Sequence, residues 1–161
     1  MGVSLRYVTQ LTGSETLIAN VPAAVSPVIS HSGFNSAAQL NADSTPPVSK
    51  VAAFQITLST GGAIDLTSLV GTNGAAVDGT GLRAQAIKIK GHADNAAAVV
   101  IAQGAANGYD GLGDSFSVAL AGGAEVVIFT ADAGADISGT NKILDLSGTD
   151  DDLVDVIIFM G

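Results

Sequence analysis

The sequence predicts an all-β protein: an antiparallel β-sandwich of the jelly-roll type, preceded by an extended N-terminal arm. From residue 50 onward, apolar and polar side chains alternate in short runs, most clearly in 54–58 and 115–120, which is the period of a half-buried strand. Glycine turns such as Asn107-Gly108 separate the runs at short intervals, as in sandwiches and barrels. About eight strands in this region fit the two four-stranded sheets of a jelly roll.

Further strands are expected from the same pattern, and one of them should be irregular. They cover residues 63–70, 82–90, 97–103, 125–130, 142–146 and 153–160. Within 82–90 the larger apolar residues change parity between Leu82 and Ile87, which predicts a β-bulge near Ala86. An immunoglobulin-like sandwich is the rival fold, and strand order would separate the two. The expected interior positions are Phe54, Ile56, Leu58, Phe116, Val118, Leu120, Val126 and Ile128.

The chain divides into an irregular part, residues 1–49, and the sandwich, residues 50–161. Short strands are expected at 16–21 and 25–29, but Pro22 and Pro27 interrupt them and belong at edges or bends. The first part has too few large apolar residues for a core of its own. It is either a flexible tail or an ordered arm that lies on a neighbouring subunit, and we favour the arm.

The last expected strand, residues 153–160, is apolar on both faces, interrupted only by Asp155. Such a strand is central and covered on each side. We expect the sandwich core on one side and another subunit on the other, so that a charge placed at Ile158 should weaken subunit association.

Composition narrows the possible functions. The 161 residues include 15 acidic and 6 basic side chains, a net charge of −9, so nucleic acid is not an expected partner. No apolar run reaches the roughly 20 residues of a membrane helix, and the first residues lack the plan of a signal peptide, which predicts a product that stays in the cytoplasm where it is made. Only 13% of residues are charged, against about 25% in ordinary domains. This composition suits a surface largely covered by neighbours.

No motif predicts catalysis, so no catalytic or cofactor-binding residue is assigned and the protein is not expected to be an enzyme. His31 and His92 look like exposed loop residues without partners for acid–base chemistry. The segment 113–116 lacks the closing glycine of a serine-nucleophile elbow. Residues 79–84 fit the dinucleotide pattern G-x-G-x-x-A, but they follow a turn and open a strand, so the match is interpreted as coincidence.

Acidic loops are the remaining candidates for a site. The run 150–152 consists of three aspartates, and Asp132, Asp136 and Asn141 fall in one loop. Calcium binds such oxygen clusters, but the spacing of an EF-hand is missing. The favoured interpretation is a solvated turn that keeps a strand end from mispairing, and no metal ligand is assigned. Asp65 and Asp145 lie in two similar segments, which we attribute to strand-end hydrogen bonding rather than duplication.

Several segments together resemble one family. They are Ile64-Asp65-Leu66-Thr67, residues 83–89, residues 104–109, Ile143-Leu144-Asp145-Leu146-Ser147-Gly148-Thr149 and the apolar C-terminal strand. In this order the region 50–161 resembles the small β-sandwich virion proteins of tailed bacteriophages known as capsid decoration or cement proteins.

That resemblance implies a structural protein with no catalytic residues. It implies a jelly-roll-like homotrimer on the capsid surface, made in the host cytoplasm, whose terminal arm binds the major capsid protein of the shell. The alternatives are another virion component, such as a tail or capsid subunit, and a carbohydrate-binding or adhesin module on the same sandwich.

Overall fold

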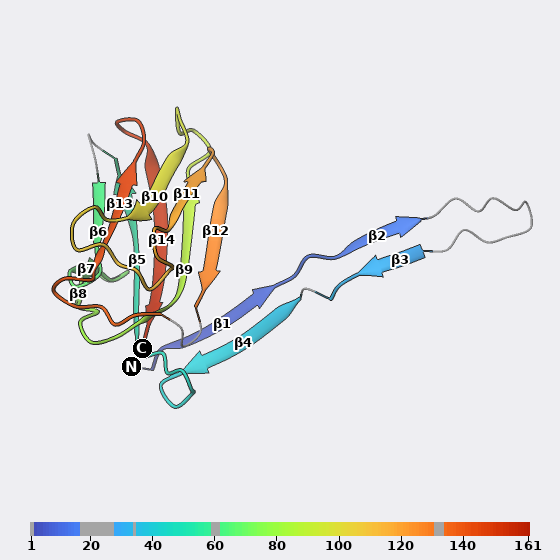
Figure 1. Cartoon of the computed structure of the whole chain (residues 1–161), viewed down its shortest axis with the longest axis horizontal. Helices are drawn as coiled ribbons and strands as arrows, with labels where there is room; N and C mark the ends of the chain where they lie inside the picture. Colours follow the sequence, from blue (N-terminus) through green and yellow to red (C-terminus); the bar gives the residue numbers. More distant parts are fainter. Residues whose placement is uncertain (1, 17–27, 34, 59–61, 131–133) are drawn as a thin grey trace, which may run out of the picture. The chain divides into compact units, whose positions relative to one another are not determined.

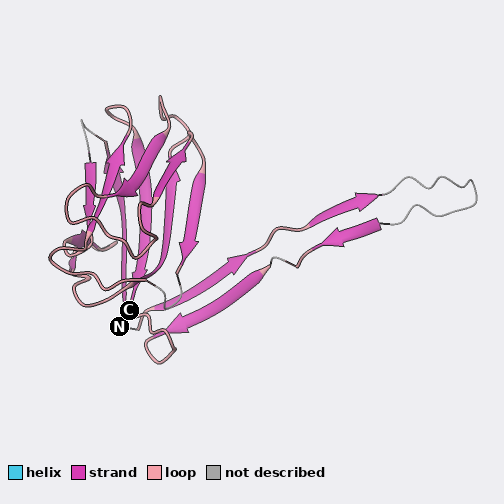
Figure 2. Cartoon of the chain, in the orientation of Figure 1, coloured by secondary structure: helices cyan, strands magenta, loops and turns pink. Residues whose placement is uncertain are grey.

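The computed structural model describes residues 2–16, 28–33, 35–58, 62–130 and 134–161, and none of these is in a helix. Two four-stranded antiparallel sheets form a β-sandwich (Figures 1 and 2). The first sheet has the order β12-β9-β14-β5, and the second has the order β11-β10-β13-β6. The strands of the first sheet are β5 (Lys50–Thr57), β9 (Ala84–Gly91), β12 (Glu125–Phe129) and β14 (Leu153–Met160). Those of the second are β6 (Gly62–Asp65), β10 (Val99–Gln103), β11 (Ser117–Leu120) and β13 (Ile143–Ser147).

The strand pairing identifies the sandwich as a jelly roll. β5 pairs with β14, β6 with β13, β9 with β12, and β10 with β11. These eight strands therefore behave as one long hairpin whose successive pairs alternate between the two sheets, as in a jelly roll. A short hairpin, β7 (Leu69–Val70) and β8 (Ala76–Val77), lies in the connection between β6 and β9.

The predicted β-bulge is present in β9. Phe159 of β14 pairs with Ala86, but the next residue, Met160, pairs with Ala84, so Gln85 is the extra residue. Because of this insertion, Ala84 and Ile87 both join the interior of the sandwich, while Ala86 packs on the outer face of the first sheet. The Gln85 side chain is also buried.

All eight predicted interior residues pack into the cluster between the sheets, but to different depths. Leu58 and Leu120 are buried, whereas the other six are half-buried. The six lie on or beside β5, β11 and β12, which are edge strands, so one flank of each side chain faces the open side of the sandwich. The deepest positions are on inner strands, for example Ile101 of β10 and Ile158 of β14.

A second, smaller cluster covers part of the outer face of the first sheet. Leu5, Leu40 and Val48 are buried there, with Val3 beside them, against Ala86, Phe129 and Phe159. Residues 1–5 and 40–161 therefore form one compact unit, and residues 6–39 form another. The segment 1–49 is thus divided between the two units.

The described residues within 6–39 form a two-stranded antiparallel ribbon (Figure 1). β2 (Gly13–Thr16) pairs antiparallel with β3 (Val28–His31), from Gly13 opposite His31 to Thr16 opposite Val28. β1 (Ser4–Thr9) pairs with β4 (Ser36–Asn41). Most of the predicted strands 16–21 and 25–29 falls in 17–27, outside the described residues; Thr16 ends β2, and Val28 and Ile29 lie in β3.

The burial pattern predicts different losses of stability at two interior positions. Ile101→Ala should lower the free energy of unfolding by about 2–5 kcal/mol, because Ile101 is fully buried. Phe116→Ala should lower it by less than the roughly 3–5 kcal/mol of a fully buried phenylalanine, because Phe116 is half-buried. Denaturant titration measures both. A loss of about 1 kcal/mol or less at Ile101, or of about 5 kcal/mol at Phe116, would contradict the assigned depths.

Candidate functional site

The two histidines lie at or directly after the ends of strands β3 and β9. His31 ends strand β3, which corrects its predicted place in a loop, since backbone pairing with Gly13 continues through it. His92 directly follows β9, and its Nδ1 lies 3.7 Å from a carboxylate oxygen of Asp94. Ser115 lies in a turn with a φ of 58°, and its N–H donates to Oε1 of Gln103 at 2.9 Å.

The glycine motif at residues 79–84 serves packing. It is followed by strand β9 and not by the helix that a dinucleotide site requires. The N–H and hydroxyl of Thr80 donate to the Asp78 carboxylate, at 2.8 and 2.6 Å, and close the turn. A Cβ at Gly79 would lie 2.6 Å from the carbonyl oxygen of Leu66 and 2.8 Å from the sulfur of Met160. Glycine is therefore needed there for close contact with the core.

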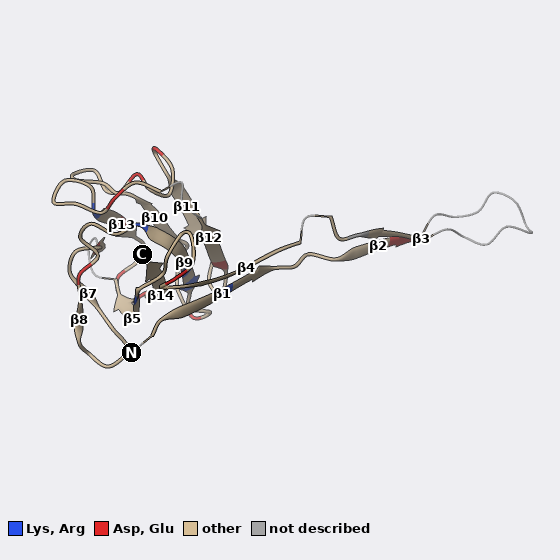
Figure 3. Ribbon diagram, turned by 90° about the horizontal axis from the view of Figure 1, so that it is seen from below, with Lys and Arg blue, Asp and Glu red and all other residues tan. Residues whose placement is uncertain are grey.

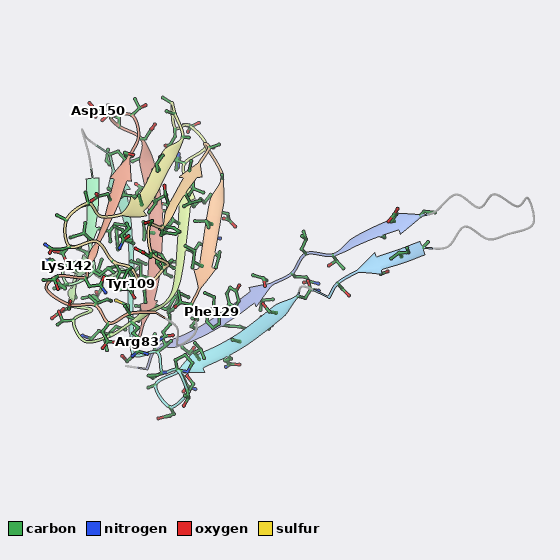
Figure 4. The ribbon with its side chains drawn as sticks, in the orientation of Figure 1. Arg83, Tyr109, Phe129, Lys142 and Asp150 are labelled. Atoms are coloured by element: carbon green, nitrogen blue, oxygen red, sulfur yellow. The ribbon has the colours of Figure 1, made fainter. Side chains whose placement is uncertain are left out.

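The aspartate run 150–152 contains one buried and two exposed carboxylates. Asp152 is only 3% exposed and accepts hydrogen bonds from the N–H groups of Ala96, at 2.7 Å, and Thr149, at 3.1 Å. Asp150 and Asp151 are exposed, and Asp150 lies at the tip of the loop between β13 and β14 (Figure 4). Asp152 is thus a structural tie between two loops.

The other acidic loop is bonded to neighbouring segments of the same chain. Asp136 forms an ion pair with Nε of Arg83 at 2.6 Å. The side-chain amide of Asn141 donates to the carboxylate of Asp110, at 2.8 Å, and to the carbonyl of Asp136, at 3.1 Å. Asp132 lies outside the described residues. Within the described ranges, no group of three or more His, Asp and Glu side chains is placed to hold a metal ion.

Asp65 and Lys142 form a half-buried ion pair between β6 and the start of β13, with Nζ and Oδ2 2.6 Å apart (Figure 4 labels Lys142). Asp65 also accepts bonds from the N–H and hydroxyl of Thr67, at 2.9 and 2.6 Å. Burial opposes ionisation of Asp65, but the bonds from Lys142 and Thr67 outweigh it, so its pKa lies below the ordinary value. Asp145, in the similar segment, instead accepts a bond from the N–H of Ala105 at 2.9 Å.

Tyr109 is a structural anchor that the sequence pattern did not single out. It is fully buried, its hydroxyl donates to the carbonyl of Ala135 at 2.9 Å, and it accepts the N–H of Ala84 at 3.1 Å. Burial raises the pKa of the phenol. The hydroxyl therefore joins two loops to the start of β9 (Figure 4). The only signal in the sequence is a lone tyrosine after an Asn-Gly turn.

One cavity has a volume of about 510 Å³ and is open and mostly apolar. It lies beside the start of β5 and the β7–β8 hairpin, with Val3, Val51 and Val77 in its walls. The Lys50 ammonium at its rim donates to the carbonyl of Asp78 at 2.5 Å. Its walls carry no cluster of groups suited to catalysis.

The outer face of the first sheet changes from apolar to charged side chains along the direction of its strands. Cross-strand pairing arranges its outward side chains in three rows. The rows are Val51-Phe159-Ala86-Phe129, Ala53-Ile157-Lys88-Val127 and Gln55-Asp155-Lys90-Glu125. The first row, near the C-terminus, is the one covered by the cluster around Leu5 and Val48. In the second row Val127 is 41% exposed and Ile157 is half-buried, so this row remains open.

The faces of β14 correct one expectation from the sequence. Val154, Val156, Ile158 and Met160 point into the sandwich and are buried, whereas Asp155, Ile157 and Phe159 point outward. Ile158 is therefore a core residue, and a charge there would damage the fold before it could report on association. β14 is a central strand, as predicted, and its own chain covers it at Phe159.

The ribbon, residues 6–39, carries most of the exposed large apolar side chains of the described residues. Four of these are Val8, Leu11, Val28 and Ile29, with exposed fractions of 46%, 81%, 61% and 41%. Its only charged residues are Arg6 and Glu15 (Figure 3). An isolated two-stranded hairpin is at best marginally stable in water. The ribbon is therefore the main candidate interaction element.

No family model, curated protein or solved structure matches the chain. No described helix is long and apolar enough to cross a membrane.

The Asp65–Lys142 pair predicts a pH dependence of stability. Because the pKa of Asp65 is lower in the folded chain, the pair stabilises the fold above the unfolded pKa of about 4 and loses this effect as pH falls through the folded pKa. Asp65→Asn should destabilise the protein at pH 7 and progressively less towards pH 2.5, as measured by urea titration. Asp94→Asn, at a side chain that is 93% exposed, is the control. An Asp65→Asn effect of equal size at both pH values would contradict the prediction.

Proposed function

We propose that this chain is a virion structural protein, a capsid decoration or cement protein that stabilises a phage head as a homotrimer. Each subunit contributes a rigid jelly-roll body and the ribbon. The ribbon binds the major capsid protein of the shell, and the bodies associate with one another. In this role the protein needs no cofactor, catalytic group or nucleic-acid contact.

The observation that carries the proposal is the exposed apolar surface of the ribbon. Leu11, in the connection between β1 and β2, and Val28, the first residue of β3, are exposed, and no described residue of this unit forms a core beneath them. Burying such side chains contributes about 25 cal/mol for each Å² of apolar surface removed from water. Contact with a partner therefore supplies the stabilisation that a two-stranded ribbon cannot generate by itself.

Two further observations support an assembling role over the alternatives. The sequence has few charges, which otherwise keep a surface from associating. A carbohydrate-binding module needs exposed aromatic platforms, but Tyr109 is buried and Phe54, Phe116, Phe129 and Phe159 pack into the two apolar clusters. The described aromatic residues of the sandwich thus serve packing.

Self-association is the first test. Sedimentation velocity of the full-length protein, diluted from about 50 to 0.5 µM, should show assemblies built from trimers at the upper end. A monomer throughout this range would contradict the homotrimer.

Binding to the shell is the second test. Leu11→Asp places a charge where 81% of an apolar side chain is exposed, so the subunit should stay folded but lose shell binding by tenfold or more. Thr12→Asp adds the same charge at the next, also exposed, residue and is the matched control. Binding is measured by co-sedimentation with heads assembled from the major capsid protein of the same genome. Equal binding by Leu11→Asp and the wild type would show that the ribbon is not the contact.

A further inference from the structure

Strand β12 is an open edge of the first sheet. It pairs with β9 on one side, and on its other side no strand of the described residues lies against it. The backbone bonds to β9 at the two ends of β12 are Gly91 N–H to Ala124 O and Thr130 N–H to Gln85 O, at 3.0 and 3.1 Å. Because inward and outward backbone groups alternate along an antiparallel strand, the even-numbered residues bond to β9. The N–H and C=O groups of Glu125 and Val127 therefore point away from β9, to the open side of the strand.

Within the described residues of the sandwich, this edge lacks the usual protection against pairing. Natural edge strands are blocked by lysine, proline, bulges or a covering segment. β12 has the sequence Glu-Val-Val-Ile-Phe and pairs regularly with β9. Val127 is 41% exposed on the outer face, while Val126 and Ile128 are half-buried at the open side of the sandwich. The edge combines unpaired backbone groups with partly exposed apolar side chains.

β12 is also complementary to itself. In an antiparallel pair centred on Val127, each Val127 lies opposite the Val127 of the other copy, and Val126 lies opposite Ile128. The apolar side chains on both faces of the strand would then pack against apolar side chains. Both halves of such a contact come from the same patch, which is the requirement for a two-fold interface.

The charges permit this register. Glu125 is the only charged residue of β12, and its carboxylate forms an ion pair with Nζ of Lys88 of its own chain at 2.9 Å. In the pair centred on Val127, Glu125 faces Phe129 and not a second Glu125. The like charges that would oppose homotypic pairing are therefore separated along the strand and already neutralised.

We propose that β12 is a homotypic interface at which two copies of this chain pair edge to edge about a two-fold axis through Val127, joining their first sheets into one continuous sheet. The interface needs only a second copy of the chain and is independent of the virion role. If the subunits are trimers, this contact links one trimer to the next.

Single-cysteine cross-linking tests the register directly, since the chain has no cysteine of its own. Opposed residues of a hydrogen-bonded antiparallel pair have Cα atoms about 5.5 Å apart, within the range for a disulfide. Full-length Val127→Cys under mild oxidation should form the covalent dimer at least tenfold faster than Thr57→Cys. Thr57 is an exposed residue at the edge strand on the other side of the same sheet. Equal rates would overturn the proposal, including the case in which both are at background.

A proline pair tests the backbone bonds. Val127→Pro removes an N–H that points away from β9, so the intrachain ladder is kept while edge pairing loses a donor. Thr57→Pro is the matched control, because Leu58 N–H bonds to Asp152 O and the Thr57 N–H therefore points outward too. Val127→Pro should weaken the two-fold association tenfold or more in sedimentation velocity, with Thr57→Pro unchanged.

Folding is checked for each variant by thermal unfolding, and Val127→Lys, with the edge-blocking residue of natural sheets, replaces Val127→Pro if that variant misfolds. Association unchanged in a folded Val127 variant would overturn the interface. If the full-length protein forms no trimers in sedimentation velocity but Val127→Cys still cross-links, the result counts against the homotrimer alone.

Discussion

The structure depends on covering both faces of β14, a central strand of the first sheet. Its inward residues, such as Val156 and Ile158, have the second sheet to pack against. Its outward residues need another cover, and among the described residues Leu5, Leu40 and Val48 provide one at Phe159. The segments on either side of the ribbon are therefore fixed to the sandwich by the requirement to bury that end of β14. Ile157 and its neighbours in the second row are left partly open.

Several carboxylates near the ends of strands connect neighbouring segments of the jelly roll through hydrogen bonds and ion pairs. Asp152 binds two backbone N–H groups, Asp65 binds Lys142 and Thr67, and Asp136 binds Arg83. A long-range all-β topology leaves many such connections to be fixed. These carboxylates are therefore engaged in structure, and the two candidate interaction surfaces, the ribbon and the β12 edge, are mainly apolar.

The sequence predicted the fold class well because alternation and glycine turns are local signals. It also located the bulge, since the parity change at Leu82 and Ile87 is visible in the chain. It could not assign the faces of β14, because a run of apolar residues has no alternation to read, and Ile158 was misplaced for that reason. Nor could it separate Asp152 from Asp150, since the buried role of Asp152 depends on Ala96, which is brought to it only by the fold.

The open edge of β12 shows where the low charge of the chain affects its structure, because charged side chains usually protect sheet edges from pairing. A monomer with a β-sandwich must protect four sheet edges, and natural proteins usually do so with charges. Here β5 begins with Lys50 and has the β7–β8 hairpin beside it, and β6 and β11 are only four residues long. β12 has neither device; its one acidic side chain is neutralised by Lys88, and Val127 stands at its centre. An unprotected strand of this kind persists in a soluble protein when pairing at that edge ends with a second copy, because a two-fold contact closes on itself and leaves no free edge for a third.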